Sequence, residues 1–465
     1  DGAAAAAGPQ LRILRDPDGP RPEVQLLSNG RYHAMLTVAG GGYTRLEGTA
    51  LTRWREDPTR DAYGSFCYLR YAESGEYWSA AYQPTCVRTQ HFEAIFSQAK
   101  AEFRVRHRGI DSHLEIAVSA EDDIELRRLR LKNRARHPRT VEVTTYAEVV
   151  LQAPRADEAH PAFGNLFVQT RILAAKQAIV CRRRAREAGE RPPQLLHLVA
   201  AHDCDIEQIS YETDRARFIG RGRSAARPLA MERLALDNSE GSVLDPIVAI
   251  RVRITLQPGQ QALLDLVTGV GEDEAACDAL IEKYRDRRLA DRVFDLAWTH
   301  SQVVHRQINA HEADVQVYER LAALVLQPDP VLRADADTLR QNRRAQPALW
   351  AQAISGDLPI VLLQVSDVDH LPLVEQVVQA HQYWRLKGLE TDLVIWNESQ
   401  AGYRQQLQEQ ILALLARDQR AEVLERRGGI FVRAVQQLGQ EDRVLLLSVA
   451  RVVLTDRAGT LAEQV

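Results

Sequence analysis

Short runs in which apolar and polar residues alternate recur between residues 24 and 270, and they constrain the fold more than any other feature. Examples are residues 103–107 (FRVRH), 114–118 (LEIAV) and 141–146 (VEVTTY). A period of two sends successive side chains to opposite faces of a strand, so each run has one apolar face. Prolines and glycine turns lie between the runs, where a missing amide donor does least harm. The region therefore predicts a large antiparallel β-sandwich over residues 24–270, preceded by a tail, 1–23, that has the look of a linker.

The periodicity changes after residue 270. Apolar residues then recur at spacings of three and four, as Ala276, Leu280 and Tyr284 do, which predicts a helical linker over residues 271–350. From 351 to 465, β-like and helical runs alternate, which favours a small α/β unit with a parallel sheet. We expect strands at 360–365, 393–396 and 430–432, and helices near 371–387, 402–417 and 440–454. The fold class expected for the whole chain is α+β and multidomain.

Composition excludes several classes of function. The chain has 59 basic and 63 acidic residues, a net charge of −4, and this balance argues against a nucleic-acid partner. We interpret the basic run at 182–186 (RRRAR) as a solvated surface. No apolar stretch reaches the roughly 20 residues needed to cross a bilayer, so we expect no membrane contact by this segment. The five cysteines are scattered without CxxC spacing, which predicts neither a zinc site nor a disulfide framework and fits a reducing compartment.

Aromatic, Arg and carboxylate residues are concentrated between residues 26 and 84. Planar aromatic rings stack on the apolar faces of sugar rings, while charged and amide groups hydrogen-bond to the hydroxyls. This mixture is typical of a carbohydrate-binding surface, although half-buried strands also alternate aromatic and polar residues. The candidate carbohydrate-binding residues are Trp54, Arg55, Glu56, Asp57, Asp61, Tyr63, Trp78, Tyr82 and Gln83.

Three carboxylates of this segment allow a second interpretation. Glu56, Asp57 and Asp61 are close enough in sequence to form a paired-carboxylate site. A solvated turn, with Asp57 before Pro58 and ion pairs to neighbouring Arg residues, explains them equally directly. Elsewhere, Asp367, Asp369 and His370 follow a predicted parallel strand, where α/β sheets place ligands, but the same residues also suit a helix cap. No motif for a metal or a cofactor is present, so we expect neither.

Several sequence segments resemble those of one protein family. The chain is similar to the amino-terminal β-sandwich of the cellobiose phosphorylase family, and in particular to the copy in bacterial cyclic β-1,2-glucan synthases. The resemblance covers nearly the whole chain apart from its Ala-rich start. The segments that show this resemblance include 28–32 (SNGRY), 52–57 (TRWRED), 78–85 (WSAAYQPT), 147–151 (AEVVL), 211–218 (YETDRARF), 244–246 (LDP), 354–360 (ISGDLPI) and 380–389 (AHQYWRLKGL).

The resemblance implies a function in β-glucan synthesis without catalysis by this segment. The family carries its catalytic acid in an Asp-Trp-Asn-Asp run of a helical barrel, and no Asp-Trp pair occurs here. We therefore expect a segment that binds or positions β-glucan, β-1,2-linked by resemblance, near a phosphorylase-like region that controls chain length. The implied partners are the glucan, other domains of a parent glycosyltransferase and, as in related phosphorylases, a second copy in a homodimer. The implied location is the cytoplasmic part of a bacterial protein anchored in the inner membrane.

Two other functions remain open at this stage. In the first, the aromatic and charged surface packs on another domain and serves only the architecture. In the second, the chain is itself a β-glucan phosphorylase or glycosyltransferase, with a loop carboxylate such as Asp61 as its acid.

Overall fold

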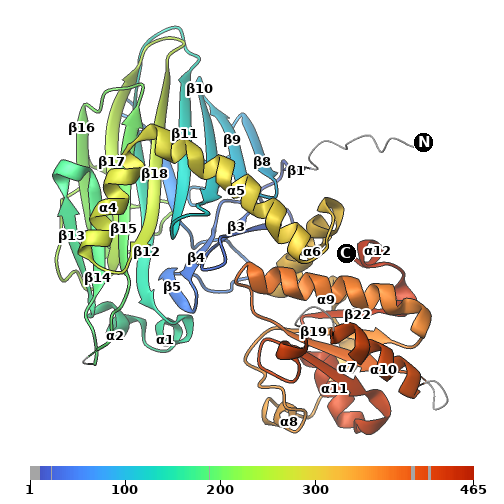
Figure 1. The fold of residues 1–465 in the computed structure, drawn as a ribbon. Helices are drawn as coiled ribbons and strands as arrows, with labels where there is room; N and C mark the ends of the chain where they lie inside the picture. The colour runs from blue at the N-terminus through green and yellow to red at the C-terminus, as the bar shows by residue number, and fades with distance from the viewer. Residues whose placement is uncertain (1–10, 22, 188, 400–403, 417–419) are drawn as a thin grey trace. The chain divides into compact units, whose positions relative to one another are not determined.

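The computed structural model describes residues 11–21, 23–187, 189–399, 404–416 and 420–465 (Figure 1). The chain forms two compact units, one built mainly from Gln25–Gln302 and the other mainly from Val303–Val465. The helix α5 (Arg287–Gln307) runs through the point where the division falls.

The first unit is built from two antiparallel sheets. One sheet has the order β1-β8-β9-β10-β11-β18-β15-β14-β13, and the other has the order β16-β17-β12-β5-β4-β3-β2, with β6 beside β12 and β7 beside β6. The strands of the first sheet are β1 (Arg12–Leu14), β8 (His91–Phe96), β9 (Ala101–His107), β10 (Ile110–Val118), β11 (Ile124–Asn133), β13 (Val168–Leu173), β14 (Ala178–Arg183), β15 (Gln194–His202) and β18 (Gln261–Gly271). Those of the second are β2 (Val24–Ser28), β3 (Tyr32–Thr37), β4 (Gly42–Leu46), β5 (Thr49–Thr52), β6 (Phe66–Tyr71), β7 (Tyr77–Ser79), β12 (Arg139–Gln152), β16 (Gln208–Asp214) and β17 (Pro246–Leu256).

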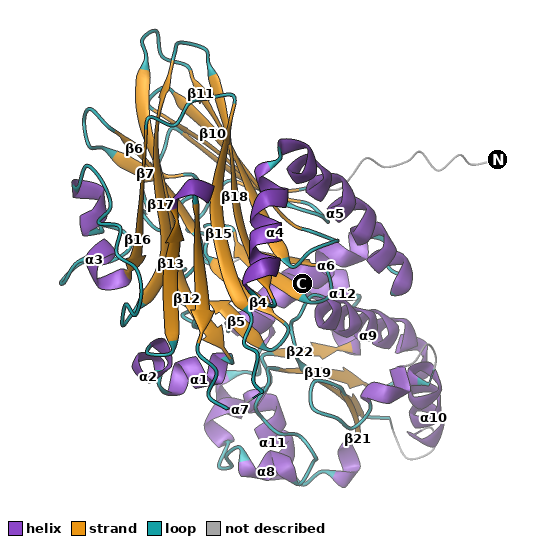
Figure 2. Cartoon of the chain, turned by 60° about the vertical axis from the view of Figure 1, so that its left-hand side comes forward, coloured by secondary structure: helices purple, strands orange, loops and turns teal. Residues whose placement is uncertain are grey.

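The two sheets share one apolar core. Buried side chains from both sheets form a single cluster that includes Leu36, Leu69, Phe103, Leu114 and Ile250. The alternation predicted from the sequence appears directly in β9, where buried and exposed residues take turns from Phe103 to His107. The predicted large β-sandwich is therefore confirmed, and the strands dominate Figure 2.

Short helices complete the first unit. α1 (Pro154–Ala159) and α2 (Pro161–Asn165) follow β12, and α3 (Arg215–Ile219) follows β16. α4 (Glu274–Arg285) packs on β15 and β18, where Cys277, Ile281 and Tyr284 join a second apolar cluster. This cluster explains the helical period after residue 270: the apolar stripe of α4 covers a face of the first sheet.

The second unit contains a parallel sheet of four strands in the order β21-β20-β19-β22. Its strands are β19 (Ile360–Val365), β20 (Asp392–Asn397), β21 (Ile430–Ala434) and β22 (Val452–Thr455), and its helices are α6 (Glu312–Leu326), α7 (Ala336–Gln341), α8 (Pro347–Trp350), α9 (Leu371–Leu386), α10 (Arg404–Leu415), α11 (Gln440–Val449) and α12 (Leu461–Gln464). The predicted small α/β unit is confirmed.

One predicted element of this unit is wrong. The helix expected over 440–454 ends at Val449, and Val452–Thr455 forms the edge strand β22 beside β19. A run of three apolar residues is too short for its period to separate a strand from the end of a helix. Within the described residues, no helix combines the length and hydropathy that a bilayer crossing requires.

Candidate functional site

The loop between β5 and β6 carries most of the candidate residues, and the main chain holds it in place. The amide of Gly42 donates a hydrogen bond to the carbonyl of Tyr63, with 2.8 Å between nitrogen and oxygen. Gly42 has φ +144°, and a Cβ there would lie 1.8 Å from the carbonyl oxygen of Met35. A Cβ at Gly41 would lie 2.9 Å from that of Asp61. At Gly41 the loop comes so close that a Cβ would collide with it, and at Gly42 a Cβ would collide with the facing strand of the hairpin, so glycine is needed at both positions.

The aromatic part of this loop is half-exposed. The ring of Trp54 meets the buried ring of Tyr43 edge to face, with 5.6 Å between centroids. The guanidinium of Arg45 lies 4.0 Å from the centre of the Tyr43 ring. Arg55 and Tyr63 are also half-exposed, and Glu56 is exposed. One ring, braced by a second, thus reaches the surface beside charged groups.

The structure places Trp78 and Tyr82 differently from the sequence-based expectation. Trp78 has 0% exposure and packs between Tyr71 and His107, with ring centroids 4.9 and 4.8 Å away. Tyr82 has 7% exposure, and its hydroxyl donates to Asp18 at 2.7 Å. Trp78 lies on the short strand β7 and enters the shared core, so its ring has no face for a sugar. Tyr82, three residues after β7, is also buried and has almost none. The structure thus leaves Trp78 no open ring face for the stacking that the sequence predicts, and Gln83 is half-buried.

Asp57 forms a compact turn. Its carboxylate accepts from the amide of Thr59 at 2.9 Å, from the Thr59 hydroxyl at 2.6 Å and from Nε of Arg60 at 2.9 Å. These hydrogen bonds, that of the Thr59 hydroxyl first, lower the pKa of Asp57 to about 2. A carboxylate that is ionised at neutral pH is poorly suited to act as a general acid.

Arg53, at the root of the loop, is the centre of a buried ion network. Its side chain is 7% exposed. Its Nε and Nη2 donate to the two oxygens of Asp157, both at 3.1 Å, and Nη1 donates to Glu148 at 2.8 Å. Arg215 donates to the other Glu148 oxygen at 2.7 Å and to Asp245 at 3.3 Å. The network joins β5, β12, α1 and α3, so it fixes where the loop leaves the sheet.

In this network, burial and the neighbouring guanidiniums have opposite effects on the pKa of two carboxyl groups. Burial acts to raise the pKa of Glu148, but the charges of Arg215 and Arg53 outweigh it and lower that pKa. Burial raises the pKa of Asp245, against the opposing charge of Arg215. Three carboxylates face Arg53, Arg215 and Arg55, whose Nη2 lies 3.7 Å from Asp157. Removing one partner from a network of this kind would leave a buried charge unpaired, so the network holds its elements in one arrangement.

Spacing in the sequence does not reveal the partners of Arg53. They come from positions up to 192 residues away, as Asp245 does. However, four of the segments that resemble the family each contribute one residue to this network: Arg53 from 52–57, Glu148 from 147–151, Arg215 from 211–218 and Asp245 from 244–246. The sequence feature that could have pointed to these partners is a charged residue inside an otherwise apolar strand pattern, such as Glu148 in residues 147–151.

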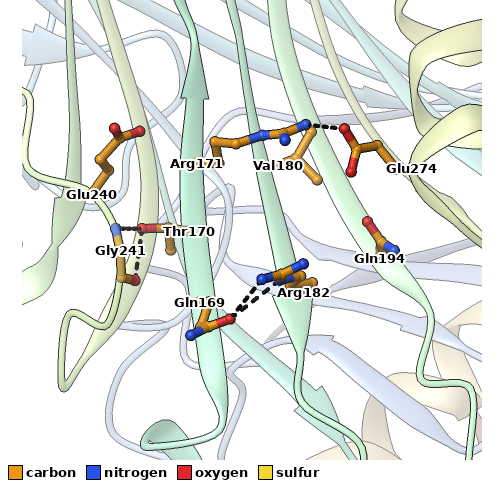
Figure 3. A pocket seen from close by; sticks show the side chains of 9 residues that line it. All are labelled: Gln169, Thr170, Arg171, Val180, Arg182, Gln194, Glu240, Gly241 and Glu274. Atoms are coloured by element: carbon orange, nitrogen blue, oxygen red, sulfur yellow. Dashed lines mark hydrogen bonds and ion pairs between the residues drawn. The ribbon is translucent and has the colours of Figure 1, made fainter.

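A separate polar pocket lies at the β13 edge of the first sheet (Figure 3). Its volume of about 280 Å³ is near the lower limit of small-molecule sites. Arg171 pairs with Glu274 across it at 2.7 Å, and Arg182 donates to Gln169 at 3.1 Å. Gln194 adds an amide to the lining. The side chains at its rim are of the kinds that bind hydroxyl groups.

Glu102, His113 and Glu115 are close enough to be considered as metal ligands among the described residues. The ammonium of Lys100 already bridges the two carboxylates, at 2.9 Å from Glu102 and 2.6 Å from Glu115. Burial acts to raise the pKa of Glu102, but hydrogen bonds from His113 and Lys100 outweigh it and lower the pKa to about 2. The cluster is satisfied by its own cation and does not require a metal ion.

Comparison with known proteins identifies the class. Residues 9–287 match the model of the glycosyl hydrolase 94 supersandwich domain. The chain therefore belongs to the glycosyl hydrolase 94 family through this domain, and it is a glucan synthase-related domain of the carbohydrate-handling kind.

Two further similarities place the chain within the family. Over its whole length it is 34% identical to the cyclic β-(1,2)-glucan synthase NdvB of Rhizobium meliloti, of which it spans 16%. It is 25% identical, over 61% of its length, to the N,N'-diacetylchitobiose phosphorylase of Vibrio furnissii, of which it spans 35%. The chain thus corresponds to a fraction of each relative.

Proposed function

We propose that this chain is a non-catalytic segment of a cyclic β-1,2-glucan synthase that binds or positions β-glucan through the β5–β6 loop. In the parent protein it would hold the glucan near a phosphorylase-like region that controls chain length. The observation that carries the proposal is the half-exposed ring of Trp54, braced on Tyr43 and flanked by Arg55 and Glu56. A rigid aromatic face beside charged groups suits the apolar face and the hydroxyls of a glucose unit.

The absence of catalysis is part of the proposal. The Arg53 network pairs its carboxylates with cations, and Asp57 is ionised in a turn. A general acid for cleavage of a glycosidic bond must keep its proton near neutral pH, which requires a raised pKa. Asp245 is the carboxyl of the network whose pKa is raised. Its hydrogen bond from the guanidinium of Arg215 nevertheless favours the ionised form, which opposes a role as a general acid.

The experiment is isothermal titration of the 465-residue chain with linear and cyclic β-1,2-glucans. Trp54→Ala is expected to weaken binding roughly 3- to 10-fold, the effect of losing one aromatic stacking contact. Trp298→Ala is the matched control, because Trp298 is 59% exposed on α5 and outside the loop. It is expected to bind as the unaltered chain does.

Each contrary outcome has a definite meaning. No heat with any glucan at millimolar concentration, together with a Trp fluorescence change on adding the adjoining segment of the parent, would favour a purely architectural role. Phosphate-dependent release of glucose 1-phosphate, abolished in Asp61→Asn, would show an enzyme. If Arg171→Ala removes binding and Trp54→Ala does not, the contact is the pocket of Figure 3.

A further inference from the structure

Three side chains meet at the carboxyl edge of the parallel sheet in the second unit. Ser366 follows β19 directly, Asp456 follows β22 directly, and His370 is the last residue before α9. Ser366 and His370 both hydrogen-bond to one carboxylate oxygen of Asp456. Oδ2 of Asp456 accepts from the Ser366 amide at 2.7 Å, from the Ser366 hydroxyl at 2.8 Å and from Nδ1 of His370 at 3.0 Å.

The cluster lies where the strand order of the sheet reverses. β19 is the first strand of the unit along the chain, β20 and β21 are added on one side of it, and β22 is added on the other. The order of strands therefore reverses between β19 and β22. In open α/β sheets, ligands bind outside the carboxyl ends of the strands at such a reversal. Ser366 and Asp456 lie on either side of it.

The cluster has a buried end and an open end. The side chain of Asp456 is 1% exposed, whereas that of His370 is 47% exposed. Burial acts to raise the pKa of Asp456, but the hydrogen bonds from Ser366 and the neighbouring His370 outweigh it and lower that pKa. A charged carboxylate that accepts from Nδ1 fixes the imidazole, so that Nε2 is directed away from the carboxylate. A turn tied by Ser366 and Asp456 alone would not need this exposed ring.

The surrounding residues restrict the chemistry of a ligand. Glu398, just after β20, accepts from Gln364 and from Arg457, both at 3.1 Å. Asp367 and Asp369 belong to the same edge, so among the side chains that the structure describes here carboxylates outnumber the guanidinium of Arg457. This charge disfavours a phosphate ester. The loop at 366–370 (SDVDH) also has no glycine, so it lacks the close backbone approach that a pyrophosphate needs.

We propose that this edge is a second carbohydrate site, which binds a neutral saccharide with one sugar hydroxyl donating to Nε2 of His370. Neighbouring hydroxyls donate to Glu398 and accept from Arg457. A polyhydroxylated, uncharged ligand matches an edge rich in acceptors with one strong donor. This inference goes beyond the loop proposed above and does not depend on it.

The test uses histidine imidazole NMR signals of the full chain, titrated with the β-1,2-linked glucose disaccharide. The His370 signal is assigned by its loss in His370→Gln. It is expected to shift in a saturable way, while the signal of the exposed His137 stays unchanged. Asp456→Asn is expected to weaken the apparent affinity roughly 3- to 10-fold, because the imidazole loses its orienting partner.

A His370 signal that does not move up to saturating sugar would overturn the proposal. If Asp456→Asn fails to fold, His370→Ala serves instead, since an exposed ring can be removed with little effect on stability; unchanged binding by that variant would also overturn it. The two carbohydrate proposals separate cleanly. A His370 shift that persists in Trp54→Ala supports this site alone, and a calorimetric response without a His370 shift supports the loop alone.

Discussion

Each unit contains a cluster centred on carboxylates, and the two clusters differ in how they end. In the sandwich, Arg53 is 7% exposed, and the more exposed members of its network, Arg215 at 39% and Asp245 at 31%, are paired with each other, so the network closes on itself. In the α/β unit, the Asp456 cluster ends in a half-exposed imidazole. A closed network can only brace the structure, whereas an open one has a group that can bind a ligand.

The largest effect should come from breaking the closed network. Arg53→Met leaves Asp157 buried without its main cation and removes one of the two guanidiniums that pair with the buried Glu148, and we expect a loss of about 3–5 kcal/mol in the stability of the sandwich. Hydrogen exchange of β5 and β12 measures it. Arg60→Ala, which removes an exposed ion pair with Asp57, should have a far smaller effect on stability. Equal effects of the two changes would contradict the structural role of the network.

Acid should destabilise the sandwich through His197. Burial lowers the pKa of His197 from 6.5 to about 3, and its two nitrogens contact Thr145 and Thr268. The unfolded chain therefore binds a proton that the folded chain excludes, and stability falls as the pH decreases from about 6.5 towards 3. The contribution is about 1.4 kcal/mol per pH unit within that window.

Urea unfolding at pH 6.5 and 4.5 checks this prediction. His197→Gln keeps hydrogen-bonding groups but cannot titrate, so its stability should depend less steeply on pH than that of the unaltered chain. His381 of the α/β unit, whose pKa burial lowers to about 4, should add a dependence confined to about pH 6.5–4. Identical slopes in the two proteins would show that His197 is protonated when folded.

The smallest effects concern the open cluster and separate its two ends. Asp456→Asn removes the charged acceptor of three hydrogen bonds and should cost about 1–3 kcal/mol, seen as faster exchange in β19 and β22. His370→Ala should cost about 0.5 kcal/mol or less, because its ring is half-exposed. A large stability loss in His370→Ala would make the imidazole a structural group.

The sequence predicted the α/β unit well because its elements are locally encoded. The helix expected at 371–387 is α9 (Leu371–Leu386), and the strand expected at 360–365 is β19. The strand β22 was missed because its pairing with β19 joins residues about 90 positions apart. A short apolar run gains its identity from a partner that local periodicity does not reveal.

The sandwich shows the limit of this approach more clearly. Period two indicated which residues form strands, but not which face of β7 is buried, so Trp78 was grouped with surface aromatics. The partners of Arg53 depend on strand register across the sheet and could not be paired from spacing. Trp54 and Glu56, by contrast, lie at the surface, as a binding role requires.

The contact of Gly42 with Tyr63 also has a practical consequence. Main-chain hydrogen bonds hold both ends of the β5–β6 loop, at the Arg53 amide and the Tyr63 carbonyl, so a stretch exchanged between them would leave and rejoin the scaffold at the same points. That stretch can accordingly be exchanged for the matching one from a relative, as a cassette, to transfer ligand preference while the scaffold is retained.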